Sequence, residues 1–327
     1  MTAPRGSRQS GRSVGLSGAV ADVRQVARGW RWGRRSLVPR SAEPYVEDSE
    51  ASVFPTAWSR RGTAKAFREI AQKGALEPLF RSQVRPSVEG LDVLTRVTGP
   101  VIFVANHSSH LDTPLILLSL PDEWRRRTAV AAAADYFFDT WWRAVGSAVV
   151  FNTFPIERRG GTMAATPGQV LADGWNLVVF PEGTRSSDGW LGKFRTGAAW
   201  LAVESQVPVI PVAHRGTFAA MPRGQGWPSP GRRPVSIRFG EPLVPEPGES
   251  AREFAPRVRA GVAALLDEDA TSWWEARKRV AAGCTPDPAG PEVAQWRRVW
   301  TQSAAPRVGG IAARRRPVWR RSSATRP

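Results

Sequence analysis

The chain has 327 residues, 42% of them hydrophobic, which is enough for one substantial core with appendages or at most two modest domains. Its single cysteine, Cys284, excludes an intramolecular disulfide and a four-cysteine zinc site. No segment of the sequence reaches the roughly 18 continuous apolar residues that span a bilayer. We therefore expect no transmembrane segment, and any membrane contact to be made from one side.

The formal charge of +17 is concentrated at the two ends of the chain. Residues 1–40 contain nine Arg and one acid, Asp22, residues 297–327 contain nine Arg and no acid, and the remaining residues 41–296 therefore sum to zero. A neutral body between two Arg-rich ends indicates basic arms for a polyanion, either a nucleic acid or an anionic membrane leaflet. The alternative is a pair of solvated tails that only keep the protein soluble.

Composition also divides the chain into three parts. Residues 1–50 are rich in Gly, Ser, Arg and Pro without apolar periodicity, which predicts a disordered basic arm. Residues 51–270 carry the apolar segments of one folded domain, and residues 271–327 form a Trp- and Arg-rich C-terminal extension. Tryptophans stand among the Arg residues of both ends: Trp30, Trp32, Trp296, Trp300 and Trp319. Such residues suit stacking on nucleic-acid bases or a lipid interface.

Apolar positions recur at helical spacing over residues 63–80, which predicts an amphipathic helix ahead of the core. Short apolar runs then predict strands at 91–97, 101–105, 148–151, 177–180, 209–212 and 235–239. Helices are predicted at 114–120, 162–172, 197–203 and 253–266. Apolar strands that alternate with helices are typical of an α/β fold, in which helices cover both faces of the sheet. Functional residues in such sheets follow the carboxyl ends of the strands.

The first motif leaves the strand at 101–105 with the residues NHSSHLD, from Asn106 to Asp112. Thr113 as N-cap and Pro114 in the first turn predict that a helix follows. A carboxylate five residues after His107 can reach back across this turn to the imidazole, fix its tautomer and leave the other ring nitrogen as a base. The alternative is that Asp112 only caps the helix and His107 is an ordinary turn histidine.

The second motif follows the strand at 177–180 and reads FPEGTRS over residues 180–186. It places a carboxylate, a flexible glycine, a hydroxyl and a guanidinium in consecutive positions, which suits a polyol phosphate. Arg185 can hold the phosphate as a fork, and Glu182 or backbone amides can bind hydroxyls. Lys193 and Arg195 add positive charge downstream. The alternative is a surface turn that contains an Arg–Glu pair.

Two further segments complete the pattern. Residues 154–159 read FPIERR, where Arg158 can be another cation that faces the phosphate or part of a solvated run of charges. Residues 207–212 read VPVIPV and predict a strand with proline at its margins, which lines a slot for an apolar chain or, for most of its residues, packs in the core. Only His214 remains to join the histidines of the first motif in a metal cluster, so we expect no metal.

These four segments, in this order, resemble the glycerol-3-phosphate and lysophosphatidate acyltransferase family. Its hallmarks are an Asn-His-x4-Asp block, a block that ends in Arg, a Phe-Pro-Glu-Gly-Thr-Arg block and an apolar block that contains proline. The resemblance covers residues 88–244, and the first and third blocks match at every position. It implies a single acyltransferase domain, with a mixed, largely parallel sheet flanked by helices.

The resemblance also implies a mechanism. His107 would deprotonate a hydroxyl of the acceptor as it attacks the acyl thioester of CoA or acyl carrier protein, while Asp112 orients the imidazole. No covalent enzyme intermediate, cofactor or metal is expected. Acceptor binding would fall to a set of residues from three of the blocks and the segment after the third: Asn106, Arg158, Glu182, Gly183, Thr184, Arg185 and Lys193.

The acceptor that the family implies is a lysophospholipid, foremost 1-acylglycerol-3-phosphate, in phospholipid biosynthesis. Another lysolipid or a glycolipid precursor is the alternative, because the apolar stretch 131–134 stands where the family often has a basic residue. The acyltransferase blocks favour an anionic membrane as the partner of the basic arms, at the cytoplasmic face and without nucleic acid. A nucleic-acid-binding protein that acts through these arms is the alternative from another class.

Overall fold

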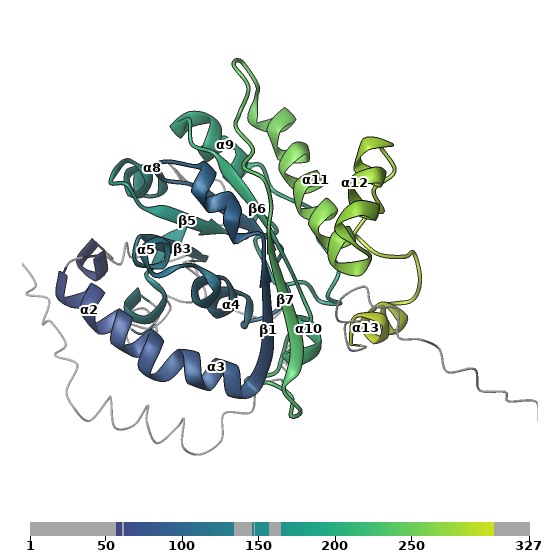
Figure 1. Cartoon of the computed structure of the whole chain (residues 1–327), viewed down its shortest axis with the longest axis horizontal. Helices are drawn as coiled ribbons and strands as arrows, with labels where there is room; N and C mark the ends of the chain where they lie inside the picture. The colour runs from purple at the N-terminus through teal and green to yellow at the C-terminus, as the bar shows by residue number, and fades with distance from the viewer. Residues whose placement is uncertain (1–56, 61, 134–145, 147, 157–164, 304–327) are drawn as a thin grey trace, which may run out of the picture. The chain divides into compact units, whose positions relative to one another are not determined.

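The computed structural model describes residues 57–60, 62–133, 146, 148–156 and 165–303 (Figure 1). Its centre is a seven-stranded sheet in the order β1-β7-β6-β2-β5-β3-β4. The strands are β1 (Val84–Glu89), β2 (Ile102–Ala105), β3 (Thr128–Ala133), β4 (Thr153–Ile156), β5 (Asn176–Val179), β6 (Val209–Arg215) and β7 (Arg233–Phe239). All neighbouring strands are parallel except β6 and β7. This confirms the prediction of a mixed, largely parallel α/β sheet.

Helices and short helical turns connect the strands. They are η2 (Ala57–Arg60), α2 (Gly62–Ala71), η3 (Gln72–Leu76), α3 (Glu77–Gln83), η4 (Leu91–Arg96), α4 (Asp112–Ser119), α5 (Asp122–Arg126), α8 (Ala165–Ala172), α9 (Gly197–Ser205), α10 (Thr217–Ala220), α11 (Ala251–Ala270), α12 (Trp273–Ala281) and α13 (Gln295–Ser303). Figure 1 shows α4 on one face of the sheet and α9 and α11 on the other. The two faces together bury β2, which lies in the middle of the sheet.

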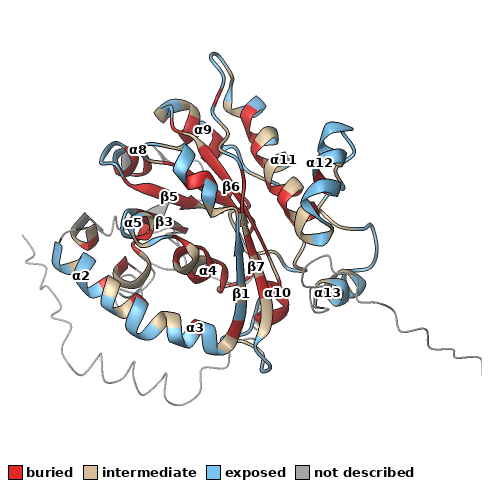
Figure 2. Ribbon diagram, viewed as in Figure 1, coloured by how far each residue is buried: buried red, intermediate tan, exposed pale blue. Residues whose placement is uncertain are grey.

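The residues of β2 contact the two faces alternately, as the two-residue period of a strand requires. Phe103 packs in the cluster that contains the α4 side chains, with Trp124 and Phe239 edge-on to its ring. Ile102 and Val104 pack in the cluster that contains the side chains of α9 and α11. Every residue of the strand is buried, and Figure 2 shows the sheet as the buried centre of the described part of the chain. The continuous apolar run of β2 therefore reflects burial on both faces.

Some predicted elements are wrong. The strand predicted at 91–97 is instead the 3-10 helix Leu91–Arg96, because the chain leaves β1 through Gly90 in a left-handed turn (φ 79°). A Cβ at this position would lie 2.1 Å from the carbonyl oxygen of Phe239. Residues 148–151 are helical, and the edge strand is β4, further along the chain. Thr113 is not an N-cap, since α4 begins at Asp112 after Leu111.

Several elements were absent from the sequence prediction. β1 contains Arg85 and Pro86 and four of its six residues are exposed, so it lacks the apolar signal of a strand. β3 is dominated by alanine, which has low strand propensity. The C-terminal extension begins with α12 and α13. The predicted arm at 1–50 and residues 162–164 of the predicted helix lie outside the described residues.

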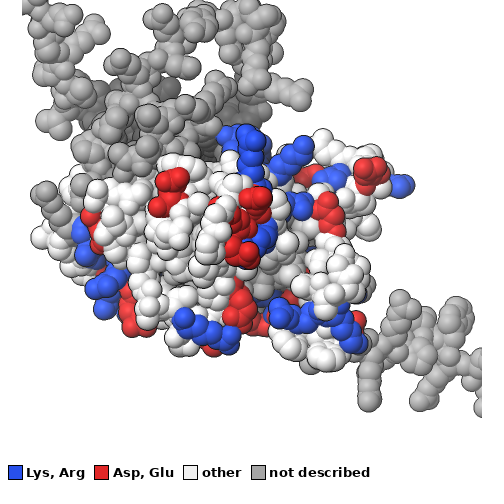
Figure 3. All heavy atoms as spheres, turned by 90° about the horizontal axis from the view of Figure 1, so that it is seen from above, with Lys and Arg blue, Asp and Glu red and all other residues white. Residues whose placement is uncertain are grey.

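Figure 3 shows Lys and Arg beside Asp and Glu on one face, which agrees with the neutral sum of residues 41–296. In the part of the chain that the structure describes, no helix is both long and apolar enough to cross a membrane.

Candidate active site

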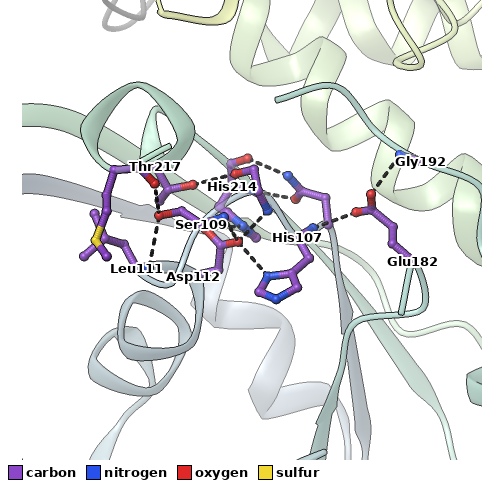
Figure 4. Close-up of polar contacts among 11 residues, drawn as sticks. His107, Ser109, Leu111, Asp112, Glu182, Gly192, His214 and Thr217 are labelled. Atoms are coloured by element: carbon purple, nitrogen blue, oxygen red, sulfur yellow. Dashed lines mark hydrogen bonds and ion pairs between the residues drawn. The ribbon is translucent and has the colours of Figure 1, made fainter. Parts of the chain in front are cut away.

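The histidine of the first block follows the carboxyl end of the central strand. β2 ends at Ala105, the chain turns through residues 106–111, and α4 begins at Asp112. The turn returns the Asp112 carboxylate to the ring, where Oδ2 lies 2.9 Å from His107 Nδ1 (Figure 4). Asp112 is fully buried, whereas 19% of the His107 side chain is exposed. A carboxylate at Nδ1 fixes the tautomer and leaves Nε2 as the nitrogen that can act as a base.

Several donors surround the Asp112 carboxylate. Its Oδ2 accepts the backbone N–H groups of Ser108 at 2.6 Å and Ser109 at 2.8 Å, and its Oδ1 lies 2.9 Å from His214 Nε2. Burial alone would raise the pKa of this carboxyl, but His214 and the hydrogen bond from His107 outweigh burial and hold the pKa below its ordinary value. Asp112 is therefore charged, and it does not cap α4, because the backbone donors precede it in the chain.

The environment of His107 favours the neutral imidazole. Burial lowers the pKa of His107 below its ordinary value, although Asp112 acts to raise it. His214 and the guanidinium of Arg185 add to the lowering. Phe180, the first residue of the third block, stacks on the imidazole with ring centroids 4.1 Å apart and 20° between the planes. A neutral ring that is held at one nitrogen and on one face is prepared to accept a proton.

The carboxylate of Glu182 binds the loop after β2 and a second point of its own loop, which runs from β5 to α9. Glu182 follows β5 and is buried; its Oε1 accepts the backbone N–H of His107 at 2.6 Å, and its Oε2 accepts that of Gly192 at 2.9 Å (Figure 4). Burial raises the pKa of Glu182 to about 7, while the two backbone hydrogen bonds act to lower it. Both oxygens of the carboxylate are thus bound to the backbone of the site.

The third block packs directly against the first. The backbone N–H of Ser186 donates to the carbonyl oxygen of His107 at 2.8 Å. Gly183 has a φ of 70°, and a Cβ there would lie 3.0 Å from Arg195 Nε, so this position favours glycine. Thr184 is exposed and Arg185 is half-buried.

The guanidinium of Arg185 lies near both histidines of the first block. Burial lowers the pKa of His110 to about 4, and Arg185 contributes to this lowering as it does at His107. The structure therefore brings the guanidinium of Arg185 near the candidate base. Lys193 lies in the same loop and is exposed, and Arg158 lies outside the described residues.

Asn106 connects β2 to β6. Its side-chain amide donates from Nδ2 to the carbonyl oxygen of His214 at 2.9 Å and accepts at Oδ1 from the backbone N–H of His214 at 3.0 Å. The side chain is buried, so both of its polar ends are used by the backbone of β6. These contacts hold the turn that carries His107 against the neighbouring strand.

The apolar fourth block is part of β6. Val209, Ile210 and Val212 are fully buried between the two helical layers, so ordinary core packing accounts for them. The same strand carries His214, which the sequence analysis considered only as a metal ligand. Its position just after a buried apolar run, in a chain with three histidines, was the signal that could have found it.

The C-terminal extension contacts the loop that follows the third block. In α13, Arg298 Nε lies 2.6 Å from Asp188 Oδ2, and the carbonyl oxygen of Arg298 accepts from Trp190 Nε1 at 3.3 Å. Ser186 Oγ donates to the same Asp188 carboxylate at 3.0 Å. The extension is therefore tied to the loop of the candidate site. Within the described residues, no group of three or more His, Cys, Asp and Glu side chains is arranged to hold a metal ion.

Comparison with known proteins identifies the domain that carries this geometry. Residues 85–215 match the family model described as Acyltransferase. This segment is an acyltransferase-family domain. The family match includes the first and third blocks and ends one residue after His214.

Two relatives that this acyltransferase-family domain resembles are both described as 1-acyl-sn-glycerol-3-phosphate acyltransferases. The 1-acyl-sn-glycerol-3-phosphate acyltransferase BAT2, chloroplastic, of Brassica napus is 30% identical over 147 residues, which are 43% of this chain and 40% of that protein. The human 1-acyl-sn-glycerol-3-phosphate acyltransferase beta is 34% identical over 124 residues, 35% of this chain and 41% of that protein. The chain thus spans about two fifths of these relatives. The crystal structure of the 1-acyl-sn-glycerophosphate (LPA) acyltransferase PlsC from Thermotoga maritima is 27% identical with a TM-score of 0.48, over 63% of this chain and 78% of that one.

Proposed function

We propose that this protein transfers a fatty acyl group from the thioester of CoA or acyl carrier protein to the free hydroxyl of a lysophospholipid, 1-acylglycerol-3-phosphate. The observation that carries the proposal is the buried Asp112 carboxylate 2.9 Å from Nδ1 of the partly exposed His107. The descriptions of the curated relatives support the choice of acceptor. The presence of the domain in an acyltransferase family supports the reaction class.

The reaction follows from the orientation of the ring. The acceptor hydroxyl gives its proton to His107 Nε2 while its oxygen attacks the thioester carbonyl carbon. The resulting imidazolium is stabilised by the charged Asp112 carboxylate at Nδ1. The C–S bond then breaks, the ester remains on the acceptor, and the thiolate leaves with the proton that His107 returns. Base and acid are the same residue, so the histidine is neutral again at the end of the cycle.

The acceptor phosphate binds at the third block. Arg185 is the first candidate, because its positive charge lies close enough to the catalytic imidazole to lower the pKa of that ring. We assign Gly183 and Thr184 to the same phosphate site, with Lys193 and Arg158 as further cations. Glu182 and Asn106 were expected to contact the acceptor as well. Their polar atoms bind backbone groups, so we assign both residues to support of the loops.

We also propose that the protein acts as a peripheral protein at the cytoplasmic face of a membrane. The Arg-rich ends support anionic lipid as the partner, and exposed aromatic and aliphatic side chains of the described part support an interface. Trp296 and Trp300 of α13 are 66% and 73% exposed. Phe67 and Ile70 of α2 are 60% and 72% exposed, on the helix expected to be amphipathic.

The direct test is incubation of the purified protein with acyl-CoA or acyl carrier protein and a panel of lysolipids, read by mass spectrometry. We expect the diacyl product from 1-acylglycerol-3-phosphate and weaker or no product from lysolipids with a substituted phosphate. Acyl transfer to a different lysolipid would show that the proposed acceptor is wrong and would leave the proposed reaction in place. No acyl transfer to any acceptor, with correctly folded protein, would overturn the proposal.

A further inference from the structure

A second imidazole contacts the carboxylate that orients His107. His214, on β6, places Nε2 2.9 Å from Asp112 Oδ1, while His107 Nδ1 lies 2.9 Å from Asp112 Oδ2 (Figure 4). The two oxygens of one buried carboxylate are therefore each in contact with a different histidine. The side chain of His214 is fully buried, whereas that of His107 is partly exposed. Only His107 can meet a substrate, so His214 acts through Asp112 alone.

The proton on His214 is at Nε2. A protonated Nε2 presents the positive side of the ring dipole to the carboxylate oxygen 2.9 Å away, whereas an unprotonated nitrogen would present the negative side, which is repulsive. The N–H direction lies outside the range of a well-formed hydrogen bond, so the contact is mainly electrostatic. Within the described residues, Nδ1 of His214 has no hydrogen-bond partner. Asp112 is thus the polar group that compensates the burial of this ring.

The position of His214 is fixed by the sheet. The two hydrogen bonds between Asn106 and the His214 backbone hold β6 against the turn that carries His107. The other residues of β6 from Val209 to Ala213 are all buried, and an apolar side chain would be the ordinary occupant of such a strand. A buried polar ring is costly unless it is paired. Its pairing with Asp112 indicates a role in the charged site.

We propose that His214 is a positioning residue: its Nε2, 2.9 Å from Asp112 Oδ1, holds this oxygen electrostatically so that Oδ2 stays aligned with His107 Nδ1. The inference rests on the proposed acyl transfer, in which this alignment sets the tautomer of the base. A carboxylate held at both oxygens cannot rotate away from the imidazole when the ring takes up the acceptor proton. The backbone N–H groups of Ser108 and Ser109 hold only Oδ2, so they cannot replace this contact.

The loss of His214 has an electrostatic signature. His214 lowers the pKa of His107 electrostatically. We attribute this effect to the positive side of its ring, which lies against the Asp112 carboxylate and opposes protonation of His107. Its removal should therefore raise the pKa of His107 and move the acid limb of activity to higher pH. The titratable and charged groups that act on His107 or are bonded to it come from α4, β6 and the loops around them: Asp112, His214, Arg185, His110 and Glu182. All except His214 are unchanged in the variants below.

The test compares His214→Leu with His214→Gln. Leucine has no donor, whereas the amide nitrogen of glutamine can occupy the place of Nε2. We expect His214→Leu to lower kcat by about 10- to 100-fold, the range for loss of a group that orients a functional side chain, with KM for both substrates within about twofold. Its acid limb should move to higher pH. His214→Gln should stay within about fivefold of the wild type and keep the original pH profile.

The matched control is Val212→Ala, on the same buried strand and without a polar side-chain atom that could bind the carboxylate. It should lower the melting temperature and leave the pH profile of kcat unchanged. A His214→Leu protein with normal kcat and pH profile would overturn the inference. So would a His214→Gln protein as impaired as His214→Leu, because the missing donor would then not be the cause. If His214→Leu does not fold, His214→Met serves for the same comparison.

Imidazole nitrogen NMR separates this inference from the proposed function, since it needs no turnover. Wild type, His214→Gln and Val212→Ala should show the same His107 pKa, with the proton on Nδ1 in the neutral ring. His214→Leu should show a higher His107 pKa. An unchanged His107 pKa in His214→Leu would overturn the inference whatever the activity. An inactive wild type with the expected NMR pattern would overturn the function and leave the positioning role in place.

Discussion

Glu182 Oε1 lies 2.6 Å from the backbone nitrogen of His107, so the block after β5 binds the loop after β2 that carries this histidine. The same carboxylate reaches Gly192, and a Cβ at Gly192 would lie 2.7 Å from Oε2. This geometry differs from the substrate contact that the sequence predicted for Glu182. A buried carboxylate with two backbone donors gives the loop of the third block and the loop of the first block one common anchor.

Glu182→Gln tests this anchor. The amide oxygen of glutamine can accept one of the two backbone N–H groups. The amide NH2 group cannot accept the other, so buried donors are left without an acceptor, at a cost of about 1–3 kcal/mol. We expect a lower melting temperature together with a lower kcat. The exposed Glu204→Gln on α9 is the control and should change neither. A stable, fully active Glu182→Gln protein would contradict the anchoring role.

The raised pKa of Glu182 predicts a pH dependence of stability. Burial raises it from 4.5 to about 7, so the folded state holds a proton that the unfolded state releases between these values. The corresponding stabilisation is complete below pH 4.5 and is lost as pH rises through about 7. In melting experiments from about pH 5 to about pH 8, the wild type should lose stability relative to Glu182→Gln, which has no titrating group there. If the melting temperatures of the two proteins changed in the same way with pH, the raised pKa of Glu182 would be contradicted.

His107→Ala tests the base. Loss of a positioned general base typically costs about 10²–10⁴ in rate, so acyl transfer should nearly disappear. The protein should still fold, because the ring is partly exposed and its backbone contacts are retained. His110→Ala should be much milder, and Asp112→Asn should be severely impaired because the amide cannot accept all the donors around it. Full activity in a folded His107→Ala protein would exclude the mechanism.

Arg185→Ala should raise KM for the lysophospholipid or lower turnover while KM for the acyl donor stays unchanged. Arg185→Lys should not restore the wild-type values, since an ammonium cannot reproduce the planar fork of a guanidinium. Steady-state kinetics with each substrate varied in turn decides the question. If the main effect were on the acyl donor, the phosphate site would have to be placed elsewhere.

The basic ends should bind anionic lipid. Near a charged leaflet each Arg contributes roughly 1 kcal/mol within about one Debye length, so binding should weaken as salt rises. Apolar contacts of exposed Trp296 and Trp300 should leave a salt-resistant part. Liposome co-sedimentation of the full chain and of a chain without 1–40 and 297–327, with DNA as competitor, measures both. Preference for DNA, or binding that is unaffected by the truncations, would refute the lipid assignment.

The parts of the site that lie near each other in sequence were predictable. His107 and Asp112 are joined by a short turn. Glu182 could be placed near them because functional residues follow the carboxyl ends of strands in such sheets. The contact between His214 and Asp112 was not, because it depends on the pairing of β2 with β6, and Asn106 and His214 are 108 positions apart. The role of Glu182 was missed for a similar reason, since its partners are backbone groups and carry no side-chain signal in the sequence.

The amide of Asn106 has a consequence for how the turn leaves the sheet. β2 stops pairing with β6 after Ala105, yet the Asn106 side chain still offers one donor and one acceptor to His214, as a peptide group would. A side chain thus takes the place of the main chain for one more rung of the ladder. The main chain can therefore bend toward α4 while the backbone N–H and carbonyl groups of His214 on β6 keep their hydrogen bonds. Aspartate, which only accepts hydrogen bonds at neutral pH, would leave that rung half-bonded.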